Sequence, residues 1–268
     1  MTQKFSKMIL YCGYLGCTTF LLLEIGVRLW GYSEHHIYDP IYMPFESSQD
    51  IPYVHKPNLW QTRGRGLAVF NTDSLGLRSM VSGKVYGEKT PDEYRIGIVG
   101  DSITFGEGVP DTADTFPQVL EDLLNQSQKL KVQVFNFGAS AYSLREMLAT
   151  LSYRMTDIQP DLVIMAFGPP VFNLSRTPTI DSAGYLIDQT VYSLPIPETV
   201  YHVFRKIHLM YIIRDATKIW FFNHRNIDRL SIEQDLPASY SYIHLFKQLS
   251  EKLGFSYVIL LLPRLEEN

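Results

Sequence analysis

The sequence predicts an α/β fold built on a parallel sheet and preceded by one transmembrane helix. Three observations carry this prediction: short apolar runs with the character of buried strands, helical segments between them, and a long uncharged stretch near the N-terminus. Strands that alternate with helices form parallel sheets covered on both faces. The predicted strands are Arg95–Val99, Val132–Phe137, Asp161–Phe167 and Phe255–Leu262.

The N-terminal stretch Met8–Leu23 carries no charge, and its apolar character continues to Trp30. As a helix, residues 8–30 would measure about 35 Å, enough to cross a hydrocarbon core of about 30 Å. Glu24 and Arg28 are one helical turn apart and lie near the far end. There they can pair with each other and reach the membrane interface.

Two lysines, Lys4 and Lys7, precede this stretch and predict a cytoplasmic N-terminus with the rest of the chain extracytoplasmic. A cleaved signal peptide is the first alternative, but no small-x-small cleavage site follows the apolar run. Lipid modification of Cys17 is the second, although Tyr14-Leu15-Gly16 is a poor lipobox. An uncleaved single-pass anchor is the favoured interpretation.

The chain is expected to divide into an anchor, a connecting segment and a main domain. These are residues 1–30, residues 31–93 packed on the main domain, and residues 94–268 with an insertion at 169–237. Helices are expected from Phe116 to about Gln126, from Ser143 to about Thr156, and over Tyr240–Leu253.

One aromatic-rich helix is expected inside the insertion, over Glu198–Phe222, with Arg205, Lys206, Arg214 and Lys218 among its apolar residues. It could form a lid over the site or a face resting on an anionic membrane. Packing of an ordinary amphipathic helix against the sheet is the favoured alternative.

Composition excludes several classes of protein. Lys plus Arg is 24 and Asp plus Glu is 28, so the formal net charge of −4 gives no reason to expect nucleic acid as a partner. Charged residues are 19% of the chain, below the roughly 25% usual for soluble proteins. Both cysteines, Cys12 and Cys17, lie in the apolar stretch, which excludes a disulfide scaffold. No metal-ligand cluster is apparent, so neither metal nor cofactor is expected.

The most informative segment is Gly100-Asp101-Ser102, directly after the first predicted strand. A glycine at a strand end allows a sharp turn, and the serine can then stand with its hydroxyl exposed at the carboxyl edge of the sheet. Free amides of a following helix could support an oxyanion. Thr104 stands where a G-x-S-x-G elbow has its second glycine, and no phosphate loop follows.

From residue 71 to 263 the chain resembles the SGNH, or GDSL-type, hydrolase family of esterases and lipases. RIGIVGDSITFGEGV is similar to the first block of the family and NFGASA to its second. PDLVIMAFGPP resembles the strand that leads to the third block, and FNTDSLGLRS resembles a segment common in membrane-anchored members. The resemblance implies a flavodoxin-like three-layer sandwich and ester hydrolysis.

Site residues follow from the same resemblance. Ser102 would be the nucleophile, and its amide one oxyanion donor. Ala141 stands at the second-block glycine and keeps an N–H, provided that its φ is negative. Asn173 is a candidate third donor through a rearranged loop, although an ordinary turn residue is the favoured interpretation. The supporting motif positions are Gly100, Asp101, Gly138 and Gly168.

The chain departs from the family pattern in two places. Where the third block has Gly-x-Asn-Asp, it has Gly168-Pro169-Pro170-Val171, and proline offers no donor. No Asp-x-x-His block follows the fourth predicted strand, so none of the histidines is assigned as base. His202, His208 and His224 could fold over Ser102, but surface or packing roles are favoured for all three.

Three interpretations of function stay open. The first is a membrane-anchored extracytoplasmic ester hydrolase acting on an acylated sugar, lipid or cell-envelope polymer, with sugar O-acyl transfer as a variant. The second is a non-catalytic binding or assembly component. The third is a truncated copy of an active enzyme: without a covering element, the last strand would expose apolar surface, so a missing C-terminal segment or a partner protein is expected there.

Overall fold

The computed structural model describes residues 2–127, 131–168, 172, 174, 178–187, 197–222 and 227–262. Two units divide the chain. Unit 1 consists of Met1–Ile37 with Leu194–Asn226, and unit 2 of Tyr38–Ser193 with Ile227–Asn268.

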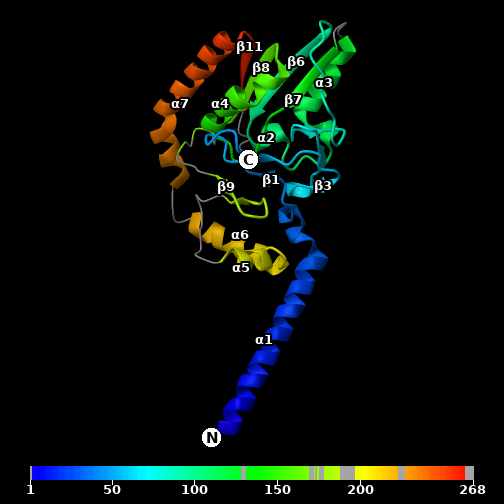
Figure 1. Ribbon diagram of the computed structural model, residues 1–268. Coiled ribbons are helices and arrows are strands. Elements are labelled where there is room, and N and C mark those ends of the chain that lie inside the picture. The colour runs from blue at the N-terminus through cyan, green and yellow to red at the C-terminus, as the bar shows by residue number, and fades with distance from the viewer. Residues whose placement is uncertain are drawn as a thin grey trace. The chain divides into compact units, whose positions relative to one another are not determined.

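A four-stranded parallel sheet forms the centre of unit 2 (Figure 1). Its strands are β6 (Glu93–Gly100), β7 (Lys131–Asn136), β8 (Leu162–Phe167) and β11 (Ser256–Leu261), in the order β11-β8-β6-β7. Numbered along the chain, this is the order 2-1-3-4 of a flavodoxin-like sheet. The predicted α/β fold with a parallel sheet is confirmed, and each predicted strand lies within two residues of the observed one.

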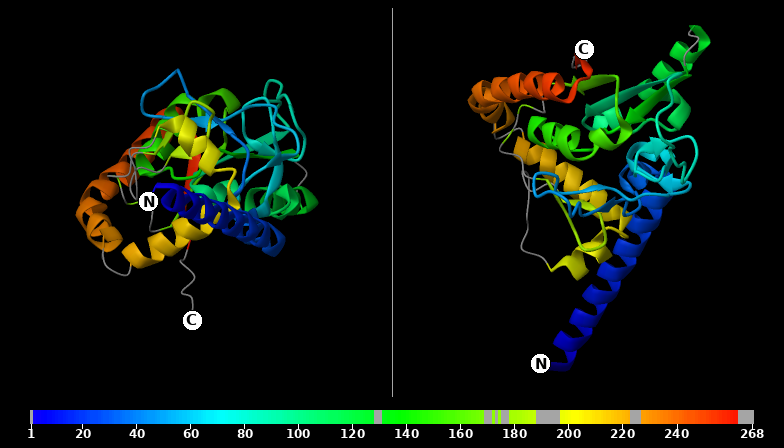
Figure 2. Two further views of the ribbon diagram at one scale, coloured as in Figure 1. Left: turned by 90° about the horizontal axis from the view of Figure 1, so that it is seen from below. Right: turned by 45° about the horizontal axis from the view of Figure 1, so that its top comes forward.

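Alternate side chains of β6, β7 and β8 enter two separate cores. Ile96 and Ile98 of β6 belong to one, against which Leu120 and Leu124 of α3 (Phe116–Ser127) pack. Val99 of β6 belongs to the other core, together with residues of α4 (Leu144–Tyr153), η4 (Met155–Ile158) and α7 (Ile227–Leu253). Because side chains alternate between the faces of a strand, helices cover both faces of the sheet, as Figure 2 also shows.

The last helix begins earlier than its sequence suggests. α7 starts at Ile227 instead of Tyr240, and Pro237 lies inside it. Proline lacks an N–H and normally interrupts a helix, which is why the prediction began after it.

Small antiparallel sheets form in the segment before β6. One pairs β1 (Tyr42–Met43) with β2 (Val54–His55), and the other joins β3 (Thr62–Arg63), β4 (Val69–Thr72) and β5 (Arg78–Ser79). Buried residues of this segment, Ile51, Tyr53, Phe70 and Leu77 among them, belong to the larger core. The short elements η2 (Arg65–Leu67) and η3 (Thr112–Asp114) and the hairpin of β9 (Thr179–Ile180) with β10 (Leu186–Ile187) complete unit 2, apart from α2, described below.

The outer strand of the sheet, β11, is largely uncovered. It pairs with β8 on one side, and all six of its residues are exposed, Leu261 by 67%. Apolar residues on an edge strand are a surface that proteins normally cover.

Unit 1 contains the N-terminal helix α1 (Thr2–Trp30), η1 (Tyr32–His36), α5 (Glu198–Phe204) and α6 (His208–Phe222). Residues 5–30 of α1 are long and apolar enough to cross a membrane, a property that a signal sequence shares. The predicted helix at 198–222 is in fact two helices, with a break at residues 205–207.

Gly100 closes β6 at a point where no side chain fits. A Cβ atom there would lie 2.5 Å from the carbonyl oxygen of Ala166 and even closer to the hydroxyl of Thr104. We therefore expect Gly100→Ala to lower the free energy of unfolding by about 1–3 kcal/mol, the usual effect of overpacking a core. Gly87→Ala is the matched control, because a Cβ at Gly87 meets nothing within 4 Å. Denaturant unfolding of the detergent-solubilised chain measures both, and equal effects would contradict the prediction.

Candidate functional site

The turn after β6 places Ser102 at the carboxyl edge of the sheet. Asp101 is the N-cap of the short helix α2 (Ser102–Phe105), and its side chain accepts the amide of Ile103 at 2.9 Å. The Asp101 side chain is buried, whereas Ser102 is half-buried. A capped and buried turn therefore places the half-buried serine at the carboxyl edge of the sheet.

Hydrogen bonds from residues that follow Ser102 in the chain fix its backbone. Its carbonyl oxygen accepts the amides of Gly106 at 3.0 Å and Glu107 at 2.9 Å. Within the described part of the chain, neither its hydroxyl nor its own amide has a hydrogen-bond partner. Both groups are thus available to a ligand.

The end of β7 is fastened to α2 by one side chain. The amide nitrogen of Asn136 donates to the carbonyl oxygen of Thr104 at 2.9 Å, and its carbonyl oxygen accepts the Gly138 amide at 3.0 Å. A Cβ atom at Gly138 would lie 2.7 Å from the Thr104 carbonyl carbon, so the two turns touch backbone to backbone. The first and second sequence blocks are therefore adjacent in space.

Ala141 follows this turn with a positive φ of 67°. The condition set for its amide as an oxyanion donor, a negative φ, is therefore not met. Left-handed backbone favours glycine and costs other L-residues roughly 1–2 kcal/mol. The residue at the expected place of the family's glycine thus adopts the conformation that glycine favours, which supports that alignment.

The third strand end is described only in part. Gly168 directly follows β8, whereas Pro169, Pro170, Val171 and Asn173 lie outside the described residues. The proposed donor role of Asn173 therefore has no structural description.

A buried arginine holds the far end of the Ser102 turn. Arg78 donates to the carbonyl oxygens of Gly106 at 2.6 Å and Val109 at 2.9 Å, and to the hydroxyl of Thr112 at 3.1 Å. Burial lowers the pKa of Arg78 to about 10, which leaves it charged at neutral pH. Arg78 belongs to FNTDSLGLRS, but nothing in the sequence says that its side chain reaches the turn.

A polar cluster adjoins the same turn. The Ser140 hydroxyl donates to Glu107 at 2.5 Å, Arg65 lies 3.4 Å from the other Glu107 oxygen, and Arg65 also donates to the Tyr38 hydroxyl at 3.1 Å. The cavity beside them measures about 10 Å³, room for roughly one water. This cluster is consequently a packed network and not a substrate pocket.

A cavity of about 470 Å³ lies at the opposite edge of the sheet. Asp161 and Ser256, which line it, stand at the amino ends of β8 and β11, and Lys89 pairs with Asp161 at 2.5 Å. Ligands of parallel sheets bind outside the carboxyl ends of the strands, so this cavity does not extend the Ser102 site.

Unit 2 has two described histidines, and neither donates to or accepts from Ser102 within the described residues. His244 is exposed on α7. His55 is buried, and its ring stacks on Phe105 of α2 at 4.1 Å between ring centres. Burial, with Arg154 and Arg78 nearby, lowers the pKa of His55 to about 3, so its ring stays neutral. Of the histidines considered as a base, His224 lies outside the described residues, while His202 and His208 belong to unit 1.

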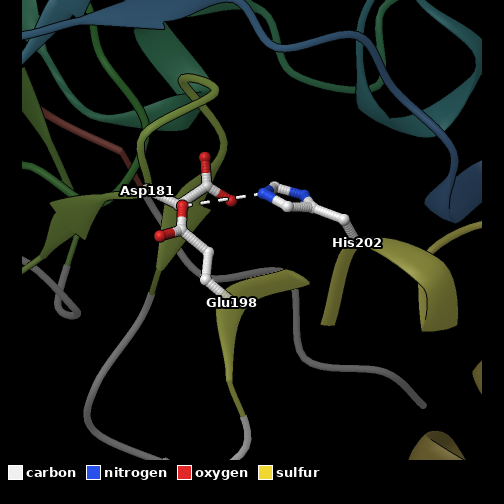
Figure 3. Close-up of side chains that lie close together, drawn as sticks. All are labelled: Asp181, Glu198 and His202. Carbon is white, nitrogen blue, oxygen red and sulfur yellow. Dashed lines mark ion pairs between the residues drawn. The ribbon is translucent and has the colours of Figure 1, made fainter. Parts of the chain in front are cut away.

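Three titratable side chains are drawn in Figure 3, and each has a role within its own unit. On α5, Glu198 and His202 are one turn apart and form an ion pair at 3.6 Å. Asp181 accepts the backbone amides of Ala183, Gly184 and Tyr185, which shapes the β9–β10 turn of unit 2.

His55 should make the fold acid-sensitive. The unfolded chain takes up a proton on His55 below pH 6.5, whereas the folded chain resists protonation down to about pH 3. The contribution of His55 to stability is therefore fully present above pH 6.5 and falls by up to about 1.4 kcal/mol per pH unit below it. Replacement of this ring, whose Nε2 has no hydrogen-bond partner among the described residues, by His55→Phe should remove that contribution while preserving the stacking on Phe105.

Denaturant unfolding between pH 5 and pH 8 checks this, with exposed His244→Gln as the control. A pH dependence in His55→Phe equal to that of the parent would contradict the assignment.

Ala141→Gly should stabilise the chain by about 0.5–1 kcal/mol, because relief of the left-handed strain exceeds the entropy that glycine adds to the unfolded state. Ala149→Gly, in the interior of α4, should instead lose at least about 1 kcal/mol. The denaturant midpoints of unfolding of the two variants, compared with that of the parent chain, test this prediction. If both were destabilised alike, the strain at Ala141 would be refuted.

No protein-family model matches the chain, and neither does any curated protein. Among solved structures, TesA is 27% identical, with 28% of this chain and 41% of TesA covered, at a TM-score of 0.26. The chain thus spans less than half the length of TesA.

AlinE4, an SGNH-hydrolase family esterase, is 17% identical, with 65% of this chain and 77% of AlinE4 covered, at a TM-score of 0.28. A variant of Axe2, an acetylxylan esterase from Geobacillus stearothermophilus, is 17% identical over 62% and 75% of the two chains, at 0.26. The sheet order, with Gly100-Asp101-Ser102 at the end of its first strand, gives this chain a flavodoxin-like α/β fold.

Proposed function

We propose that the chain is a membrane-anchored, extracytoplasmic ester hydrolase that uses Ser102 as its nucleophile. One observation carries the proposal: the Ser102 hydroxyl lies half-exposed at the carboxyl edge of β6, without a partner among the described residues. Asp101, Asn136 and Arg78 hold the turn around it. A serine presented in this way suits attack on an acyl carbonyl.

The chemistry would be acyl transfer in two steps. The Ser102 oxygen attacks the ester carbonyl carbon, the hydroxyl proton passes to a base, and the alcohol leaves. Water then hydrolyses the acyl-enzyme and returns the serine. The amide of Ser102, with Asn173 as a further candidate, would donate to the oxyanion. The base remains unassigned among the described residues.

The acyl ester would belong to a sugar, a lipid or a cell-envelope polymer. Acylated carbohydrate is one of these classes, and Axe2 is by its name an acetylxylan esterase. If a sugar hydroxyl replaced water in the second step, the same acyl-enzyme would carry out O-acyl transfer.

Membrane anchoring is proposed on the length and composition of α1. Residues 5–30 form one apolar helix, and only 6% of its most apolar window is buried by protein. Lys4 and Lys7 at its start favour a cytoplasmic N-terminus.

A second function, assembly with another polypeptide, is favoured by β11. Its apolar residues 257–261 are exposed by 37% or more, along an edge to which no other strand of the described part of the chain pairs. Strand addition at such an edge is a common mode of protein recognition.

Ser102→Ala should abolish ester hydrolysis. With a short-chain aryl acetate as substrate, we expect the rate of the detergent-solubilised chain to fall about 10³-fold or more, towards the uncatalysed rate. Ser152→Ala, which removes an exposed hydroxyl on α4, should leave the rate unchanged. Equal rates from the parent and Ser102→Ala would rule out hydrolysis through this serine and leave assembly as the function.

A further inference from the structure

A carboxylate of the N-terminal helix caps a helix that lies far along the chain. The two oxygens of Glu24 accept the backbone amides of His208 at 2.9 Å and Leu209 at 2.8 Å, the first two residues of α6. Arg28 donates to Glu24 at 2.8 Å and to the carbonyl oxygen of Lys206 at 3.0 Å. These bonds stop α5 from continuing into α6 and fix the connection between them to the side of α1.

The middle of α6 is fastened to the residues that follow α1. Asp215 accepts the hydroxyl of Tyr32 at 3.2 Å and pairs with His36 at 2.9 Å. The His36 ring also stacks on Tyr211 at 5.5 Å between centres. From Glu24 to His36, α6 therefore runs alongside the C-terminal end of α1 and η1.

The position of Glu24 along α1 sets the depth of this contact. From Met8, the first residue after Lys7, to Glu24 the helix has a length of about 24 Å, most of the thickness of a hydrocarbon core of about 30 Å. If α1 spans the bilayer, Glu24 stands close to where the hydrocarbon ends. The connection between α5 and α6, bonded to Glu24 and Arg28, then lies at the same depth.

α5 itself is amphipathic and has no buried residue. Val200, Val203 and Phe204 share one face at helical spacing and are exposed by 37%, 57% and 37%. At helical spacing, Glu198 and His202, which form an ion pair, fall on the opposite face. Exposed apolar side chains on a short helix are unfavourable in water and favourable at a membrane surface.

Cationic residues follow directly at the end of α5. Arg205 and Lys206 connect it to α6, with Lys206 exposed. Such side chains reach lipid headgroups while their aliphatic parts remain among apolar neighbours.

We propose that α5 lies in the lipid–water interface beside α1, with Val200, Val203 and Phe204 toward the acyl chains and Lys206 at the headgroups. The partner of this face is the bilayer itself. The inference rests on the proposed anchoring by α1, because continuity with that anchor sets the depth of α5. Unit 1 would then bind the membrane through two helices, α1 spanning it and α5 at its interface.

An environment-sensitive fluorophore on single cysteines tests this in the full chain, reconstituted in phosphatidylcholine–phosphatidylglycerol vesicles. The native cysteines, Cys12 and Cys17, are exposed and would first be changed to serine. A probe at Val203→Cys should emit at shorter wavelength and be quenched by lipids that carry a quencher near the headgroup end of the acyl chain. Val85→Cys is the matched control, a valine of unit 2 that is 77% exposed.

A third probe, at Leu15→Cys in α1, is tested with lipids that carry the quencher deep in the acyl chain, because Leu15 lies near the centre of the proposed span. This probe separates the inference from the anchoring on which it depends. Quenching of both Leu15→Cys and Val203→Cys supports the proposal. If Leu15→Cys is quenched while Val203→Cys behaves like Val85→Cys, α5 is not interfacial although the anchor stands. A shifted but unquenched probe at Val203→Cys indicates protein contact, such as a second copy, and also overturns the proposal. If neither is quenched, the anchoring itself is wrong.

Discussion

The arrangement around Ser102 depends on the two hydrogen bonds of one buried amide, that of Asn136. This side chain joins the turn after β6 to the turn after β7, through Thr104 on one side and Gly138 on the other. A buried amide satisfied at both ends holds its partners strongly, because the loss of either bond would leave a polar group unpaired away from water. Gly100 and Gly138 let the backbones approach closely enough for those bonds to form.

The sequence predicted the parts of the fold that depend on local patterning. Apolar runs located β6, β7, β8 and β11, and the helix expected from Ser143 is α4, which begins with a capping box of Ser143 and Glu146. These features were accessible because periodicity and capping are properties of residues close together in the chain.

What the sequence did not predict depends on contacts between distant residues. Arg78 donates hydrogen bonds to the Ser102 turn, and the hydrogen bonds of Glu24 divide the expected helix at 198–222 into two. No local sequence pattern predicts either set of bonds. The positive φ of Ala141 is likewise a product of the surrounding fold, because alanine itself disfavours it. The local sequence signals also predicted no helix across Pro237, whereas α7 continues through this residue.

The capping of α6 by Glu24 also bears on the order in which the molecule is made. The donor and acceptor are 184 residues apart in the chain, and the larger part of unit 2, Tyr38–Ser193, is encoded between them. During synthesis α1 leaves the ribosome first, and its carboxylate can bind the α6 amides only after that part of unit 2 has been translated. Domains generally fold as they emerge, so unit 2 can complete its sheet up to β8 before unit 1 closes. A folded intervening domain shortens the effective loop that must be closed and lowers the entropic barrier to that late step.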